Sequence, residues 1–198
     1  MNLRLWNKLD KKQKDYIYAY QSLEFIKKVW KRLSEKQRNF ICLYQSLPIT
    51  FIEQIWNKLD KKQRNYICIC QKLNINFIKQ YWNELNKDQR KYVCKNQKLG
   101  IEFIKQHWNE LNKEQRKHIC IHQKLDINFI KQKWKELDKE QKDYICIRQE
   151  LPITFIEQIW NELNEYQKNI IKTKSDNITK LVLLGLEKIK EKGEKRKK

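Results

Sequence analysis

The chain has 198 residues, of which 40% are hydrophobic and 34% charged, with only 3 glycines and 2 prolines. This composition argues against a sheet-rich fold and against disordered filler. The 44 Lys and Arg residues outnumber the 24 Asp and Glu residues, and the resulting net charge of +20 attracts polyanions (nucleic acid, acidic membranes or acidic proteins) without selecting among them.

Tryptophan recurs at positions 6, 30, 56, 82, 108, 134 and 160, with a first step of 24 residues and then five steps of 26. A fixed period in this range is typical of stacked repeat proteins, in which each unit buries its apolar side against the next one. We therefore predict an all-α fold, an α-solenoid of about seven 26-residue helix-turn-helix repeats over residues 1–176. Residues 177–198 are predicted to form a C-terminal capping helix and a basic tail.

Each repeat opens with an apolar helix face of about three turns, as in Phe77, Ile78, Trp82 and Leu85. The next residue is always Asp, Asn or Ser, and Gln follows three places later, which is the pattern of a capping box. This pair starts a second helix at once, so the two helices are predicted to form a tight hairpin. The pairs are Asp10 with Gln13, Ser34 with Gln37, Asp60 with Gln63, Asn86 with Gln89, Asn112 with Gln115, Asp138 with Gln141, and Asn164 with Gln167.

The second helix carries an aromatic residue, Ile, Cys, Gln and Leu, as in Tyr66, Ile67, Cys68, Gln71 and Leu73. The Gln recurs as Gln21, Gln45, Gln71, Gln97, Gln123 and Gln149. An amide on a packing face fits a structural ladder that bonds the backbone of a neighbouring repeat, and we favour this over a ligand-reading role. The link to the next repeat has Pro, Gly, Asn or Asp at one position, where one helix can end and another begin.

Five of the six cysteines recur twelve residues after Trp. Equivalent positions in packed helices lie about 8–10 Å apart, which is too far for a disulfide. The cysteines and the three histidines do not have metal-finger spacing. We predict small, half-buried packing residues, with no metal and no cofactor, in a reducing compartment. The N-terminus lacks a signal-peptide core and no apolar run reaches membrane length, so we expect an intracellular (cytoplasmic) protein.

The sequence contains no catalytic constellation. A Gly-rich phosphate loop is excluded by the scarcity of glycine, and no Ser, His and Asp group stands out from the repeat. We predict that the chain is not an enzyme and has no small-molecule substrate.

A basic residue lies eight places after every tryptophan, and we call this set the stripe residues. They are Lys14, Arg38, Arg64, Arg90, Arg116, Lys142 and Lys168. The position falls in the first turns of the second helix, where the helix dipole disfavours a cation. Contact with phosphates is one interpretation. A solvated helix face, or pairing with Glu84, Glu110, Glu136 and Glu162 on the first helix, is the other, and both stay open.

A second candidate position lies fourteen places after tryptophan and varies in chemistry. We call its members the variable residues, and they are Tyr20, Tyr44, Cys70, Asn96, His122 and Arg148. Repeat arrays can read one base per unit with such a position. Variation is also expected at a surface site that nothing constrains, and we favour that interpretation.

The units resemble short repeats in poorly characterised proteins of phages and large DNA viruses. The matching residues include Phe77-Ile78, Tyr66-Ile67 and Gln71-Lys72-Leu73, and the resemblance covers residues 3–171. The chain departs from that pattern in an extra Lys-Lys-Gln segment and in having Cys for the usual Ser. The resemblance implies no settled activity, only a viral or mobile-element protein directed at a host component.

The leading functional prediction is a non-enzymatic scaffold that binds nucleic acid, either RNA or single-stranded, through the stripe residues with Tyr44, His122 and Arg148. The alternative is a protein-interaction module, or an inhibitor, that docks an acidic host protein. Neither prediction includes a membrane partner.

Overall fold

The computed structural model describes residues 8, 10, 13, 17, 18, 20–175 and 182–185. This part of the chain is helical and contains no strand, and its helices follow the sequence period, so the predicted all-α repeat solenoid is confirmed. The chain divides into two compact units, residues 1–100 and 101–198. The predicted extent of the array, residues 1–176, stays a prediction.

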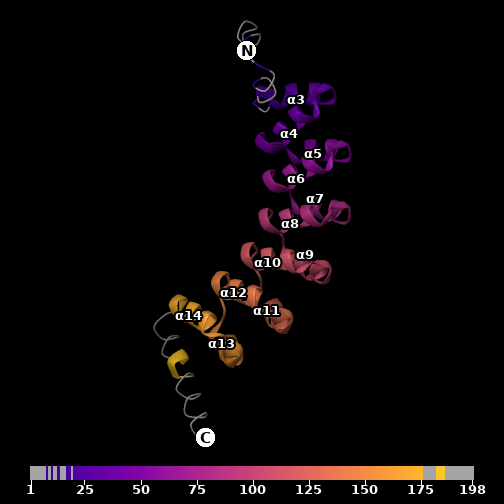
Figure 1. Cartoon of the computed structure of the whole chain (residues 1–198). Coiled ribbons are helices and arrows are strands. Elements are labelled where there is room, and N and C mark those ends of the chain that lie inside the picture. Colours follow the sequence, from indigo (N-terminus) through magenta and orange to yellow (C-terminus); the bar gives the residue numbers. More distant parts are fainter. Residues whose placement is uncertain are drawn as a thin grey trace. The chain divides into compact units, whose positions relative to one another are not determined.

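Among the described residues of the first unit, three helical hairpins follow one another, and each pairs a seven-residue first helix with a ten-residue second helix (Figure 1). A short 3-10 turn that starts at Trp ends every first helix. The elements are α3 (Leu23–Val29), η1 (Trp30–Arg32), α4 (Glu35–Tyr44), α5 (Ile49–Ile55), η2 (Trp56–Lys58), α6 (Lys61–Cys70), α7 (Ile75–Tyr81), η3 (Trp82–Glu84) and α8 (Lys87–Asn96).

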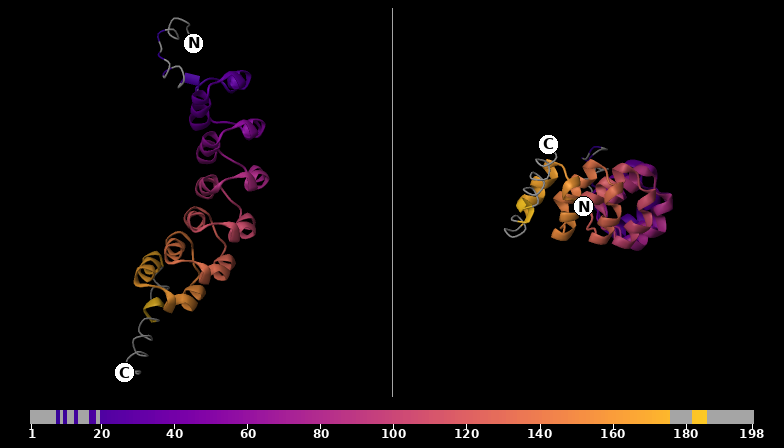
Figure 2. Two further views of the ribbon diagram at one scale, coloured as in Figure 1. Left: turned by 45° about the vertical axis from the view of Figure 1, so that its right-hand side comes forward. Right: turned by 90° about the horizontal axis from the view of Figure 1, so that it is seen from below.

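The second unit repeats this plan. Its elements are α9 (Ile101–His107), η4 (Trp108–Glu110), α10 (Lys113–His122), α11 (Ile127–Lys133), η5 (Trp134–Glu136), α12 (Lys139–Arg148), α13 (Ile153–Ile159), η6 (Trp160–Glu162) and α14 (Glu165–Lys174). Within each unit the second helices pack side by side in one layer, and the first helices form the other (Figure 2).

All seven predicted capping boxes are present. In the box formed by Asp60 and Gln63, for example, the Gln63 N–H donates to Asp60 Oδ1 at 2.8 Å. The Asp60 N–H donates to Gln63 Oε1 at 3.3 Å. The first helix ends just before each box, because the 3-10 turn tightens its last turn. The N–H of Leu59, for instance, bonds the carbonyl of Trp56 at 3.1 Å. The tight hairpin therefore follows from the 3-10 turn and the capping box, which are next to each other in the sequence.

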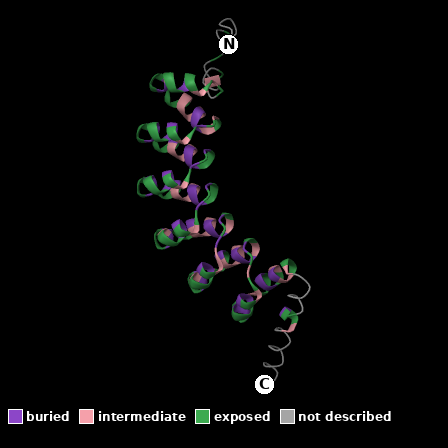
Figure 3. Cartoon of the chain, turned by 180° about the vertical axis from the view of Figure 1, so that it is seen from behind, coloured by how far each residue is buried: buried purple, intermediate pink, exposed green. Residues whose placement is uncertain are grey.

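Buried residues recur in every described hairpin (Figure 3), and the tryptophans from Trp30 to Trp160 are all among them. Trp56 is completely buried, and its ring meets the Phe77 ring of the next repeat edge to face, with centroids 5.0 Å apart. Trp108 meets Phe129 in the same way at 5.1 Å. Each repeat thus buries its largest side chain against its neighbour, as the repeat pattern predicts.

The recurrent Gln forms the predicted ladder. Gln71 Nε2 donates to the carbonyls of Cys42 at 2.9 Å and Gln45 at 2.7 Å, and its Oε1 accepts from the Leu47 N–H at 2.9 Å. One side chain thereby satisfies three backbone groups of the preceding repeat, two of them in buried bonds. The recurrent cysteines were predicted to be half-buried, which is wrong: they are 0–1% exposed, because their small side chains sit where second helices approach most closely.

Lys14 and the start of the first repeat lie outside the described residues. Of the predicted capping helix, residues 182–185 are described and are helical. The remainder of residues 177–198 lies outside the description.

Candidate nucleic-acid interface

The six described stripe residues, Arg38 to Lys168, lie over the tryptophan rings of their own repeats. The distances from the charged centre to the ring centroid are 5.7 Å for Arg38, 4.9 Å for Arg64, 4.9 Å for Arg90, 5.2 Å for Arg116, 5.0 Å for Lys142 and 5.6 Å for Lys168. A cation at this distance from an aromatic face is attracted by the ring quadrupole, and more strongly where water is excluded. These six cations therefore help to cover the core.

Three of the stripe arginines also bond the end of the first helix. Arg90 Nε donates to the carbonyl of Trp82 at 3.3 Å, and Arg116 Nε donates to that of Trp108 at 3.1 Å. Arg38 Nη2 donates to the carbonyl of Lys31 at 3.3 Å. These carbonyls belong to the 3-10 turn that ends the first helix, where the helix dipole favours a positive charge. A cation that is unfavourable for the second helix thus stabilises the end of the first.

Burial of the stripe residues limits what they can offer a ligand. Lys168 is only 4% exposed, and its Nζ pairs with Glu165 Oε1 at 3.0 Å. Arg38, Arg64, Arg90, Arg116 and Lys142 are half-buried. The expected pairing with a first-helix Glu occurs between Arg64 and Glu84, at 3.9 Å. The recurrence of a cation here follows from tryptophan packing and requires no ligand.

The variable residues, in contrast, are all exposed. Tyr20 is 60% and Tyr44 51% exposed. From Tyr44 onward, each variable residue is also the last residue of its second helix. The structure therefore brings these positions together at one edge of the second-helix layer in each unit.

A half-buried ring lies one helical turn before most variable residues, and sequence reasoning missed its significance. These rings belong to Phe40, Tyr66, Tyr92, His118 and Tyr144. The Phe40 and Tyr44 rings stack with centroids 5.9 Å apart and planes inclined by 19°. The His118 and His122 rings stack at 5.7 Å and 26°. In each pair the ring at the variable position is exposed and the ring that it stacks on is half-buried.

Exposed lysines follow three of the six variable residues, two places further on. These edge lysines are Lys72, Lys98 and Lys124. Each lies between a buried ladder Gln and a buried Leu, which hold the backbone on both sides of the lysine. The lysine side chain itself is exposed to solvent. The recurring Gln-Lys-Leu triplet is the sequence signal that could have identified them.

An open hollow lies between the ends of α10 and α12 in the second unit. Its volume is about 490 Å³, and Ile121, His122, Lys124, Leu125, Arg148 and Glu150 contribute to its lining. Variable residues of two successive repeats, His122 and Arg148, thus share one hollow with an edge lysine. Its polar lining mixes two cations, an imidazole and one carboxylate.

The positive charge is concentrated in the first unit. Residues 20–100 contain 17 Lys and Arg against 6 Asp and Glu, whereas residues 101–175 contain 14 against 12. Ion pairs in the second unit include Lys117 with Glu140 at 2.9 Å and Lys113 with Asp138 at 3.3 Å. The excess charge available to a polyanion therefore lies mainly in residues 20–100.

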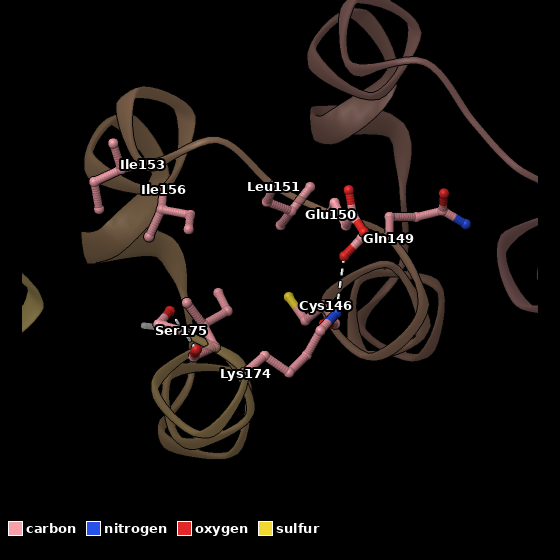
Figure 4. Close-up of a pocket in the computed structure, with 9 residues that line it drawn as sticks. Cys146, Gln149, Glu150, Leu151, Ile153, Ile156, Lys174 and Ser175 are labelled. Carbon is pink, nitrogen blue, oxygen red and sulfur yellow. Dashed lines mark hydrogen bonds between the residues drawn. The ribbon is translucent and has the colours of Figure 1, made fainter. Parts of the chain in front are cut away.

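A smaller pocket of about 180 Å³ lies beside α14 (Figure 4). Here Ser175 stands where other repeats have the ladder Gln, and Lys174 takes over its role. Lys174 Nζ donates to the carbonyls of Cys146 at 2.8 Å and Gln149 at 2.8 Å. Leu151, Ile153, Ile156 and Ile171 line much of the remaining wall. The pocket reflects the substituted ladder position.

No group of three or more His, Cys, Asp or Glu side chains in the described ranges could hold a metal ion. No helix among these residues has both the length and the apolar character needed to cross a membrane.

Comparison of the chain with protein-family models, curated proteins and solved structures gives no match. The resemblance to phage and viral repeats therefore stays a prediction.

Proposed function

We propose that the chain is a non-enzymatic repeat scaffold that binds single-stranded nucleic acid, RNA or DNA. The observation that carries this proposal is the combination of stacked rings and edge lysines at the ends of the second helices, in a chain whose residues 20–100 have a large excess of positive charge. Stacking surfaces beside a positive backbone track are what sequence-tolerant single-strand binders use.

Single strands fit this edge better than duplexes. Aromatic rings stack with bases that are splayed out of a helix, whereas bases in a duplex are already stacked on one another. The edge lysines attract phosphates by releasing counterions, so affinity should fall steeply with salt. The stripe residues add long-range charge, while their direct contacts are with tryptophan.

The helix ends at this edge do not oppose an incoming phosphate as strongly as ordinary helix C-termini. Free carbonyls at a helix C-terminus normally favour cations. At the end of α6, however, the carbonyls of Cys68 and Gln71 accept bonds from Gln97 Nε2 at 2.9 and 2.8 Å. The ladder therefore satisfies acceptors that a phosphate would otherwise meet.

Fluorescence anisotropy tests the proposal with labelled oligo(U), oligo(dT) and a 20-base-pair duplex over about 50–300 mM salt. The test variant changes Lys72, Lys98 and Lys124 to Glu. The control changes three other exposed lysines to Glu, which alters the net charge equally: Lys28 in α3, Lys79 in α7 and Lys135 in the 3-10 turn η5. We expect tight, salt-sensitive binding of both single strands by the native chain. The test variant should bind more weakly than the control, with a salt slope smaller by about 2.

Two results would reject the proposal: no salt-dependent binding of any single strand, or equal losses in the test and control variants. A stoichiometric protein partner that co-purifies after nuclease treatment, together with no nucleic-acid binding, would point to a protein-interaction module instead.

A further inference from the structure

We infer that the variable residues select bases, one per repeat, on a single strand that crosses the ends of the second helices. This inference rests on the proposed function and adds sequence preference to it. In α-helical arrays that read RNA, two or three side chains per repeat contact one base. Here the two side chains are the variable residue and the ring one helical turn before it.

Chemical contrast between positions is the first argument. The residues around the variable position are nearly constant between repeats: a Cys two places before it, a Gln directly after it and a Leu three places after it. The variable position itself contains Tyr, Cys, Asn, His and Arg. Because these side chains are exposed at the ends of their helices, packing does not dictate their identity.

Local support of the side chains is the second argument. His122 stacks on His118 with centroids 5.7 Å apart, and Tyr44 stacks on Phe40 at 5.9 Å. Asn96 Nδ2 donates to the carbonyl of Tyr92 in the same helix at 3.1 Å. A side chain that is held in one orientation loses less freedom when it binds a base than a solvated one does.

The hollow between α10 and α12 is the third argument. It brings His122 of one repeat and Arg148 of the next around a volume of about 490 Å³, within the range of small-ligand sites. A base placed there can stack on the imidazole and meet the planar guanidinium of Arg148. Lys124, which also lines the hollow, supplies charge for the adjoining phosphate.

The chemistry of each variable residue gives its expected preference. The fork of an Arg matches guanine, and an Asn amide matches adenine. Tyr20 and Tyr44 offer stacking without discrimination, because every base has a ring face. Asn96 is therefore expected to select adenine and Arg148 to select guanine.

The test is selection from a random pool of single-stranded 14-mers, as RNA and as DNA, followed by sequencing of the bound fraction. The swapped variant carries Asn96→Arg together with Arg148→Asn, which leaves the net charge unchanged. The control exchanges an exposed residue of α7 and one of the 3-10 turn η5, Gln80→Lys with Lys135→Gln, and is also neutral in charge. A third variant, His122→Asn, adds a second amide. Circular dichroism melting checks that all variants fold.

We expect adenine and guanine to exchange places in the enriched motif of the swapped variant, with enrichment at each place changing about fivefold or more. The control should retain the native motif, and His122→Asn should gain adenine at one place. Binding without base preference, or a motif that neither the swap nor His122→Asn alters, overturns the inference and leaves the proposed function standing. Failure of the native chain to bind any pool member removes both.

Discussion

The guanidinium carbon of Arg64 lies 4.9 Å from the centroid of the Trp56 ring, which is completely buried. The same contact recurs in each described repeat from Trp30 to Trp160. It explains why a cation is retained at the start of a helix whose dipole disfavours it. The cation is attracted by the ring, and in Arg90 and Arg116 it also donates to a carbonyl at the C-terminal end of the preceding helix.

Replacing Arg64 should therefore affect stability. We expect Arg64→Met to lower the free energy of unfolding by about 1–2 kcal/mol, because the ring loses a partly desolvated cation–π contact. Arg64→Lys should lose less, since Lys142 occupies the equivalent place over Trp134 at 5.0 Å. Urea denaturation at constant salt measures both values. An Arg64→Met chain as stable as the native one would show that the contact contributes nothing.

The ladder gives a second stability prediction. Gln71 bonds one N–H and two carbonyls of the preceding repeat. Gln71→Leu leaves these backbone groups without their partner, and we expect a loss of about 2–4 kcal/mol. Hydrogen exchange should localise the damage, because the Leu47 N–H loses its acceptor. Gln80→Leu, at an exposed position, is the control and should change neither quantity. Unchanged exchange at Leu47 in the Gln71 variant would contradict the assignment.

The sequence was sufficient for the repeat architecture because its signals are local. A cap residue and a Gln three places later lie on adjacent turns, so Asp60 and Gln63 could be paired without a structure. The ladder was also predictable, since an amide on an apolar face needs a backbone partner. In contrast, the contact of Arg64 with Trp56 joins two helices, and its geometry depends on how sharply the 3-10 turn reverses the chain. The hollow beside His122 depends on the packing of successive helices, which spacing does not reveal.

Thiol reactivity separates the two kinds of cysteine. Burial raises the pKa of the Cys68 thiol to about 12. Partial burial also raises the pKa of Cys70, two residues later, but this side chain is exposed to the reagent. Only thiolates react quickly with alkylating reagents. At pH 8, iodoacetamide should therefore modify one of the six cysteines in the folded chain and all six in guanidinium chloride. Mass spectrometry counts the adducts, and Cys70→Ser should remove the native-state adduct. Rapid labelling of Cys68 or Cys94 in the folded chain would contradict the observed burial.

The same burial predicts that stability declines at high pH. The pKa of Cys68 rises from its ordinary 9.0 to about 12 in the folded chain, and that of Cys94 does likewise, mainly because burial penalises the thiolate. Between these values the unfolded chain has lost the proton and the folded chain has kept it. The free energy of unfolding should therefore fall as pH rises above about 9, by up to about 1.4 kcal/mol per pH unit for each thiol.

Lysines and tyrosines also titrate in this range, so the thiol contribution must be isolated by comparison. Urea denaturation of the native chain and of a Cys68→Ala, Cys94→Ala variant, both from pH 8 to 10.5, provides it. The variant begins less stable because it lacks two buried sulfur atoms. Its decline above pH 9 should nevertheless be shallower, since two of the groups that ionise only on unfolding are gone. If the two curves stay parallel across the range, the thiols do not ionise preferentially in the unfolded chain and the link between their burial and stability fails.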